Sequence, residues 1–175
     1  MANAREILSR MKSVQDTRKI TNAMYLISST KLKKNKKLLE ETEPYFYSLQ
    51  DLIRRILRHM PDVEHFYFNP RKEIKEEDRV KGLIVITGDK GLAGAYNHNV
   101  LKMAQEWMEQ SKNHRLYVVG ELGRHYFEAR HIQVEEQFHY TVQNPTMHRA
   151  RLISSTILED YEEGRLDEVW IIYTQ

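Results

Sequence analysis

The stretch Gly88–Gly94 (GDKGLAG) has the composition of a phosphate-binding loop, and it lies between an apolar run and a predicted helix. Its glycines follow the spacing G-x-x-G-x-x-G, which differs from the dinucleotide pattern G-x-G-x-x-G. It is not a P-loop either, because no Gly-Lys-Ser/Thr follows. Glycines also permit a tight turn and close contact between a helix and a strand. The sequence therefore favours a structural turn, with a nucleotide site as the less favoured alternative.

A second candidate is the basic segment Lys31–Lys37 (KLKKNKK), which holds five lysines in seven residues. On a helix these side chains surround the axis rather than forming one stripe. Nucleic-acid-binding surfaces usually add interleaved aromatic residues and clustered arginines, and this segment has neither. We therefore expect a solvated basic collar that meets an acidic partner or an anionic membrane surface, and no nucleic-acid binding.

The remaining polar residues form no recognisable catalytic or metal-binding pattern. None of the eight histidines belongs to an H-x-x-x-H pair, and there are no cysteines. Ser154 and Ser155 have no G-x-S-x-G context. The adjacent Glu135 and Glu136 point in different directions in any regular structure. We expect no catalytic residue, no cofactor and no metal.

Composition indicates a chain without a membrane span or a secretion signal. The 175 residues are 41% hydrophobic and 30% charged, with a formal net charge of +2. No apolar run approaches the roughly 18 residues that cross a bilayer, and the N-terminus carries charges where a signal peptide has an apolar core. The charge is uneven, however: residues 1–58 carry a net +7 and the remainder a net −5. Two regions of different character are therefore joined in one chain.

Residues 1–60 read as one long helix. The first glycine is Gly82 and the first proline is Pro44, which should kink the helix. An apolar seam recurs at about every 3.5 residues, which is typical of a coiled coil. The seam is diluted by Thr21, Ser28, Asn35 and Thr42, which predicts loose pairing with another long helix or with a second copy of the chain. Its apolar members are Ile7, Met11, Val14, Met24, Tyr25, Leu32, Leu38, Leu39, Phe46, Leu49, Leu52, Ile53 and Ile56.

The rest of the chain predicts a polar surface connector over residues 61–79 and a Rossmann-like α/β domain over residues 80–175. Strands are expected at 80–87, 116–119 and 168–173, and an extended segment at 131–140. Helices are expected at 96–110, 121–129 and 146–163. Alternating strands and helices favour a parallel sheet with right-handed crossovers. The sequence stops directly after the third strand, so we expect a domain truncated at that point.

Two stretches carry a family resemblance. Met11–Lys37 closely resembles the N-terminal helix of ATP synthase gamma subunits, and Ile86–Val100 (ITGDKGLAGAYNHNV) is similar to that family's I-T-S-D-R/K-G-L-C-G-G-x-N-x-N motif. The first stretch matches the family pattern at Ser13, Val14, Thr17, Lys19, Ile20, Thr21, Ala23, Met24, Ser28 and Lys31. The second departs from it at Gly88, Ala93, Ala95 and Tyr96, all within a turn. The family continues into a long C-terminal helix that pairs with the N-terminal one, and nothing in this sequence corresponds to that helix.

The resemblance implies a non-catalytic rotor-shaft subunit that couples proton flow to ATP synthesis or hydrolysis and binds no nucleotide. Its implied partners are the alpha and beta catalytic subunits, the epsilon subunit and the c-ring. Lys19 and Met24 would contact acidic loops of the beta subunits, Lys31 would lie toward the membrane end, and the loop Asp89-Lys90-Gly91 would face the lower part of the catalytic ring. The implied location is the cytoplasmic face of the bacterial membrane. A nucleotide-binding α/β enzyme and a basic-helix nucleic-acid binder are the alternative interpretations.

Overall fold

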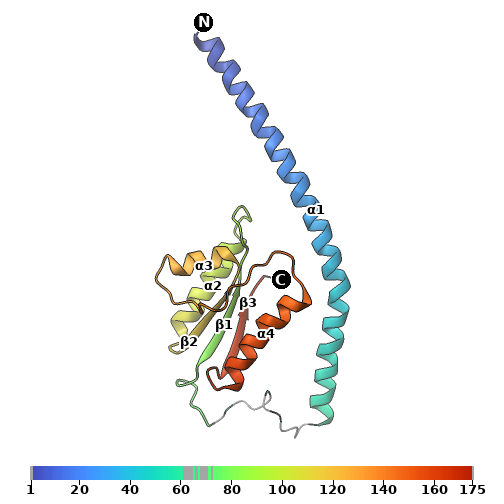
Figure 1. Cartoon of the computed structure of the whole chain (residues 1–175), viewed down its shortest axis with the longest axis vertical. Helices are drawn as coiled ribbons and strands as arrows, with labels where there is room; N and C mark the ends of the chain where they lie inside the picture. Colours follow the sequence, from blue (N-terminus) through green and yellow to red (C-terminus); the bar gives the residue numbers. More distant parts are fainter. Residues whose placement is uncertain (1, 61–64, 66, 68–70, 72, 175) are drawn as a thin grey trace. The chain divides into compact units, whose positions relative to one another are not determined.

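The computed structural model describes residues 2–60, 65, 67, 71 and 73–174, and the chain divides into two compact units, 1–64 and 65–175. In its described part, the first unit consists of one helix, α1, spanning Ala2–His59 (Figure 1). At 1.5 Å per residue its 58 residues reach about 87 Å. Helical structure continues through Pro44, although proline donates no backbone hydrogen bond. The prediction of one long N-terminal helix is confirmed.

Local hydrogen bonds accommodate the polar residues of α1. The hydroxyls of Thr17, Thr21, Thr30 and Thr42 each donate to the carbonyl four residues earlier, at 2.8–2.9 Å. Such bonds satisfy a threonine hydroxyl without an external partner. The apolar side chains of the seam cannot be satisfied within the helix in this way, and they are exposed along its whole length.

The second unit is built on a three-stranded parallel sheet in the order β2-β1-β3 (Figure 1). The strands are β1 at Lys81–Ile86, β2 at His114–Val119 and β3 at Glu168–Ile172. In the register of the sheet, Leu83 of β1 lies beside Leu116 of β2 and Trp170 of β3. The α/β class and the parallel sheet predicted from alternating strands and helices are confirmed.

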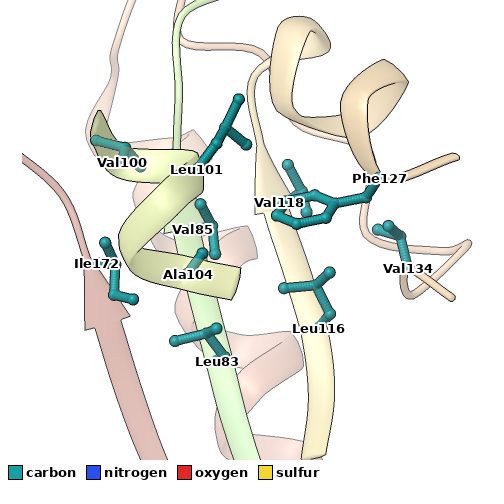
Figure 2. Packing of buried hydrophobic residues seen from close by; sticks show 10 residues of the cluster. All are labelled: Leu83, Val85, Val100, Leu101, Ala104, Leu116, Val118, Phe127, Val134 and Ile172. Carbon is teal, nitrogen blue, oxygen red and sulfur yellow. The ribbon is translucent and has the colours of Figure 1, made fainter. Parts of the chain in front are cut away.

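Both faces of the sheet are covered, as the continuous apolar run of β1 predicts. One face packs against α2 (Tyr96–Gln110) and α3 (Glu121–Glu128), where Leu101 and Phe127 lie over Val85 and Val118 (Figure 2). The other face packs against α4 (Met147–Glu162), whose Ile157 joins a second apolar cluster. That cluster contains Ile84, Tyr117, Val119, Phe138, Ile157 and Leu166.

The third strand is less buried than its apolar sequence suggests. Val169, Trp170 and Ile171 have exposed fractions of 39%, 48% and 54%. Both outer strands are edges, but β2 is covered on its outer side by the segment that bonds Glu135 to Leu116 and bridges Tyr140 to Val119. Among the described residues β3 pairs only with β1 and has no such cover. Trp170 keeps one aromatic contact across the face, to Trp107 of α2 at a centroid distance of 6.1 Å.

Two connecting segments differ from the simple sequence expectation. Of the predicted connector 61–79, residues 61–64, 66, 68–70 and 72 lie outside the described ranges, and its last part is attached to the domain. Arg71 donates to the Leu166 carbonyl at 2.8 Å and to the Asp167 carboxylate at 2.6 Å. The segment 131–140, expected to be extended, is mostly irregular, with turns at 131 and 136–137 and a single strand-like bridge between Tyr140 and Val119.

A buried polar network fastens α4 to β2. The Asp160 carboxylate accepts hydrogen bonds from the Tyr117 hydroxyl and from Arg165, and Arg115 lies 3.7 Å away. Burial and the hydrogen bond to Asp160 raise the pKa of the Tyr117 hydroxyl, so it remains a donor throughout the physiological range. No described helix combines the length and apolar character needed to cross a membrane.

Candidate partner-binding surfaces

The loop Gly88–Gly94 leaves the carboxyl end of β1, where the chain turns toward α2. Its base is held by two hydrogen bonds. The Gly88 amide donates to the buried Asn97 side chain at 2.7 Å, and the Gly88 carbonyl accepts from the Leu122 amide at 3.1 Å. The first turn of α2 and the start of α3 therefore position the loop at the edge of the sheet.

Asp89 faces the domain rather than solvent. Its Oδ1 accepts hydrogen bonds from the Glu121 amide at 3.3 Å and from the Val142 amide at 3.2 Å. Its Oδ2 is inaccessible to solvent and has no hydrogen-bond partner among the described residues. Because Glu121 is the first residue of α3, the carboxylate sits at a helix N-terminus, which favours a negative charge. Asp89 thereby joins the loop to α3 and to the segment at Val142.

This geometry disfavours a phosphate at the loop. At the carboxyl edge of the sheet, the α3 amide that could receive an anion already binds the chain's own carboxylate. A phosphate placed there would meet a like charge. Gly94 has a φ of +58°, as a tight turn requires, but a Cβ there would meet nothing within 4 Å.

The close backbone approach that the sequence suggested for this loop occurs elsewhere, at Gly120. A Cβ on Gly120 would lie 2.3 Å from the Thr87 carbonyl oxygen, and its φ is +103°. A glycine that the packing requires therefore follows β2, and Gly123 of α3 is another, with a Cβ position 2.6 Å from the Thr87 hydroxyl oxygen.

The other predicted residues of the loop are exposed. Lys90 and Gly91 both face solvent, so the structure separates them from the inward-facing Asp89. Leu92, which the sequence analysis did not single out, has an exposed fraction of 93% and a φ of +64°. The available signal was a large apolar residue set in a glycine-rich turn.

On α1 the predicted contact residues do not form a single patch. At about 100° per residue, Met24 and Lys31 are seven residues apart and share a stripe, and Met24 is itself a member of the apolar seam. Lys19 is about 120–140° away and lies on the opposite side of the helix from seam positions such as Thr21 and Ser28. All three side chains are exposed, and Lys19 also lies 3.4 Å from Asp16.

The seam is clearest at every seventh residue. These positions are apolar near both ends and polar across the middle of α1. They are Ile7, Val14, Thr21, Ser28, Asn35, Thr42, Leu49 and Ile56. Polar residues at such positions reduce pairing strength and specify register. The helix therefore offers two apolar segments separated by a weakly pairing one.

The remaining chemistry of the domain consists of ion pairs. Arg79 donates to Glu168 at 2.8 Å, and this hydrogen bond lowers the pKa of the Glu168 carboxyl below its ordinary value. His139 lies 2.7 Å from Glu121. In the part of the chain that the structure describes, no three histidine or acidic side chains are grouped to hold a metal ion.

Together these features define a class of protein: a small α/β domain that follows a long helix with an exposed apolar seam, the form expected of a subunit of a larger assembly. The chain belongs to the ATP synthase family, whose family model matches residues 3–175. Its relatives in that family are gamma chains.

Three of these relatives are similar over nearly the whole of this chain. The ATP synthase gamma chain of Ruminiclostridium cellulolyticum is 47% identical over 99% of it, and that of Acetivibrio thermocellus is 45% identical over 99%. The gamma chain of Caldanaerobacter subterraneus is 43% identical over 98%. The alignments cover 58% of each relative, so the chain spans little more than half of their length.

Proposed function

We propose that the chain acts as the central-shaft gamma subunit of a rotary ATP synthase, which couples proton translocation to ATP synthesis or hydrolysis. In this role it carries no catalytic residue and binds no nucleotide or other cofactor. Its relatives bear the name ATP synthase gamma chain, and the chain belongs to the same family. The observation that carries the proposal is α1, a 58-residue helix with an exposed seam along its length.

A shaft requires a long, uninterrupted helix that can pair with a second helix. Torque must pass along it, so it must reach well beyond a domain of ordinary size; at about 87 Å, α1 does. Polar residues occupy the middle of the seam, so packing against a partner helix is weaker there than at the apolar ends. Weaker packing suits a shaft that turns inside a ring.

The partners on the shaft are the alpha and beta catalytic subunits. Lys19, on the side away from the seam, is available to acidic loops of a surrounding ring while a second helix occupies the seam. Met24 belongs to the seam and Lys31 lies on the same stripe of the helix, and both would contact the ring where the paired helices leave a gap. The net charge of +7 over residues 1–58 favours acidic partners.

The α/β domain is assigned to the membrane end, next to the epsilon subunit and the c-ring, with the loop Asp89-Lys90-Gly91 toward the catalytic subunits. The assembly would hold the chain at the cytoplasmic face of the bacterial membrane. Within the loop, Lys90 and Gly91 would make contact, and Asp89 would keep the loop in position through its bonds to Glu121 and Val142.

Two other functions remain to be separated from this one. A nucleotide-binding α/β enzyme requires a ligand at Gly88–Gly94, where the Asp89 carboxylate lies against the helix terminus. A basic-helix nucleic-acid binder requires an affinity that falls steeply with salt, because released counterions drive such binding.

Capture by purified alpha and beta subunits tests the proposal. The wild-type chain should be retained by their assembly, and Lys19→Glu and Lys31→Glu should weaken retention by about tenfold together. The double reversal Lys75→Glu/Lys112→Glu, at two exposed lysines of the second unit, is the matched control for net charge and should leave retention unchanged.

If neither Lys19→Glu nor Lys31→Glu changes retention, the contact with the alpha and beta subunits lies elsewhere on the chain. No retention of the wild type, combined with salt-dependent binding to duplex DNA or saturable binding of ATP, would replace the proposed function with one of the alternatives.

A further inference from the structure

The tip of the Gly88–Gly94 loop combines three unusual features at one residue. Leu92 is the most exposed of the large hydrophobic residues in the described chain, at 93%. Its φ of +64° lies in the left-handed region, which a residue with a branched side chain rarely adopts. A glycine on the N-terminal side and Gly94 two residues later bracket it, so the loop could turn without placing a leucine there.

The loop that holds Leu92 is anchored at its base. Gly88 is bonded to Asn97 and Leu122, and the Asp89 carboxylate accepts the amides of Glu121 and Val142. On the α2 side, the Tyr96 amide donates to the Ala93 carbonyl at 3.3 Å. Strained residues persist where the surrounding structure imposes them, and they concentrate at functional positions.

The exposed chemistry of the tip is one leucine and one positive charge. Of the loop's two charged side chains, Asp89 is turned into the domain and Lys90 faces solvent. A complementary surface is therefore an apolar socket with an acidic rim. A single leucine beside a single lysine is too small a feature to hold a protein on a bilayer, whereas a preset conformation favours a socket of matching shape.

We propose that Leu92 is the contacting residue of this loop and inserts into an apolar, acid-rimmed socket on the alpha–beta assembly. Asp89 is a positioning residue that acts through the loop. This inference rests on the proposed function and deepens it, because it moves the contact from Asp89-Lys90-Gly91 to Leu92 with Lys90 beside it.

The strain at Leu92 makes the test specific. Asparagine and glycine adopt the left-handed conformation more readily than leucine, so Leu92→Asn and Leu92→Gly should leave the melting temperature of the full chain unchanged or raise it. The same variants should weaken capture by the assembled alpha and beta subunits at least tenfold, because the apolar group is lost. Leu92→Met, which keeps an apolar side chain, should retain capture within about threefold.

Leu152→Asn, at an exposed leucine of α4, is the matched control and should leave capture unchanged. Capture of Leu92→Asn equal to wild type would overturn the inference while leaving the proposed function intact. Loss of capture in Leu92→Met as well as Leu92→Asn would overturn it too, because an apolar socket accepts methionine. Absence of wild-type capture would overturn the proposed function, and this inference with it. Unchanged capture together with Leu92-dependent binding to phosphatidylserine vesicles would reassign the tip to a membrane.

Discussion

Arg79 and Glu168 join the segment before β1 to the first residue of β3, and their hydrogen-bonded pair is partly buried, with exposed side-chain fractions of 19% and 27%. The Trp170 indole also donates to Glu168, at 3.2 Å. The Arg79–Glu168 ion pair therefore attaches the first residue of β3 to the segment before β1. The hydrogen bond from Arg79 is the main reason why the pKa of the Glu168 carboxyl is lowered.

This pair predicts a loss of stability in acid. The depressed folded-state pKa means that the stabilisation is fully present above the ordinary glutamate pKa of about 4.3 and is lost as pH falls through the lower folded value. Glu168→Gln should lower the melting temperature at pH 7 by about 4 °C, for a loss of about 1 kcal/mol. The difference from wild type should shrink below about pH 4.

Tryptophan fluorescence suits this measurement, because Trp107 and Trp170 both lie in the α/β domain and are the chain's only two tryptophans. Glu109→Gln, at an exposed glutamate of α2, is the matched control. A gap between wild type and Glu168→Gln that stayed constant from pH 7 to pH 3.5 would show that the pair contributes through packing alone.

At the scale of elements, the junction between β2 and α3 depends on a glycine. The Gly120 amide donates to the Tyr140 carbonyl at 2.8 Å, and a Cβ at this position would meet the Thr87 carbonyl at the end of β1. The start of α3 thus lies directly against β1. The same contact brings the Glu121 amide within hydrogen-bonding distance of the Asp89 carboxylate. The position of the loop therefore depends on the packing at Gly120.

We therefore predict that Gly120→Ala destabilises the α/β domain by roughly 2–4 kcal/mol, because a positive φ and a backbone clash add together. Urea unfolding followed by tryptophan fluorescence measures the change. Gly91→Ala is the matched control: it adds the same methyl group in open space and should change stability by less than about 0.5 kcal/mol. Equal effects of the two substitutions would contradict the close approach at Gly120.

The elements that sequence predicts well are those determined by local pattern. The helix Ala2–His59 follows from a glycine-free run of helix-forming residues, and β1 follows from its apolar run. The exposure of Trp170 and Ile171 does not follow from sequence, because it depends on strand order and on which edge other segments cover; β2, the opposite edge, is buried. Strand order is a nonlocal property that apolar content does not encode.

The candidate site shows the same division. The sequence located the loop Gly88–Gly94 as a turn between a strand and a helix. It could not show that Asp89 faces inward, because the amides that bind its carboxylate belong to Glu121 and Val142, 32 and 53 residues away along the chain. Nor could it identify Leu92 as the tip, because exposure depends on how the loop is anchored at its base.

At the scale of the whole molecule, the two units differ in how they satisfy their apolar surface. The α/β domain buries its apolar residues on both faces of a sheet, with Leu83 and Phe127 at 0% exposure. The helix α1 leaves Val14 at 68% and Ile53 at 48% within the described residues. A helix without tertiary support is only marginally stable in water. Pairing with another helix removes that cost, and a second copy of the chain is one available partner.

We therefore predict that the isolated chain self-associates through the α1 seam. Sedimentation velocity between about 1 and 100 μM should show a concentration-dependent shift toward a dimer or a larger species. The double substitution Leu49→Glu/Ile53→Glu places charges in the apolar part of the seam near the C-terminal end of α1. It should weaken association at least tenfold, because burying each aliphatic side chain contributes about 1.5–3 kcal/mol to the free energy of association. Tyr47→Glu, about 160° around the helix from Leu49, is the control and should associate like wild type. A chain that stays monomeric at every concentration, with the amides of α1 protected from hydrogen exchange, would mean that the helix is stable without a partner along its seam.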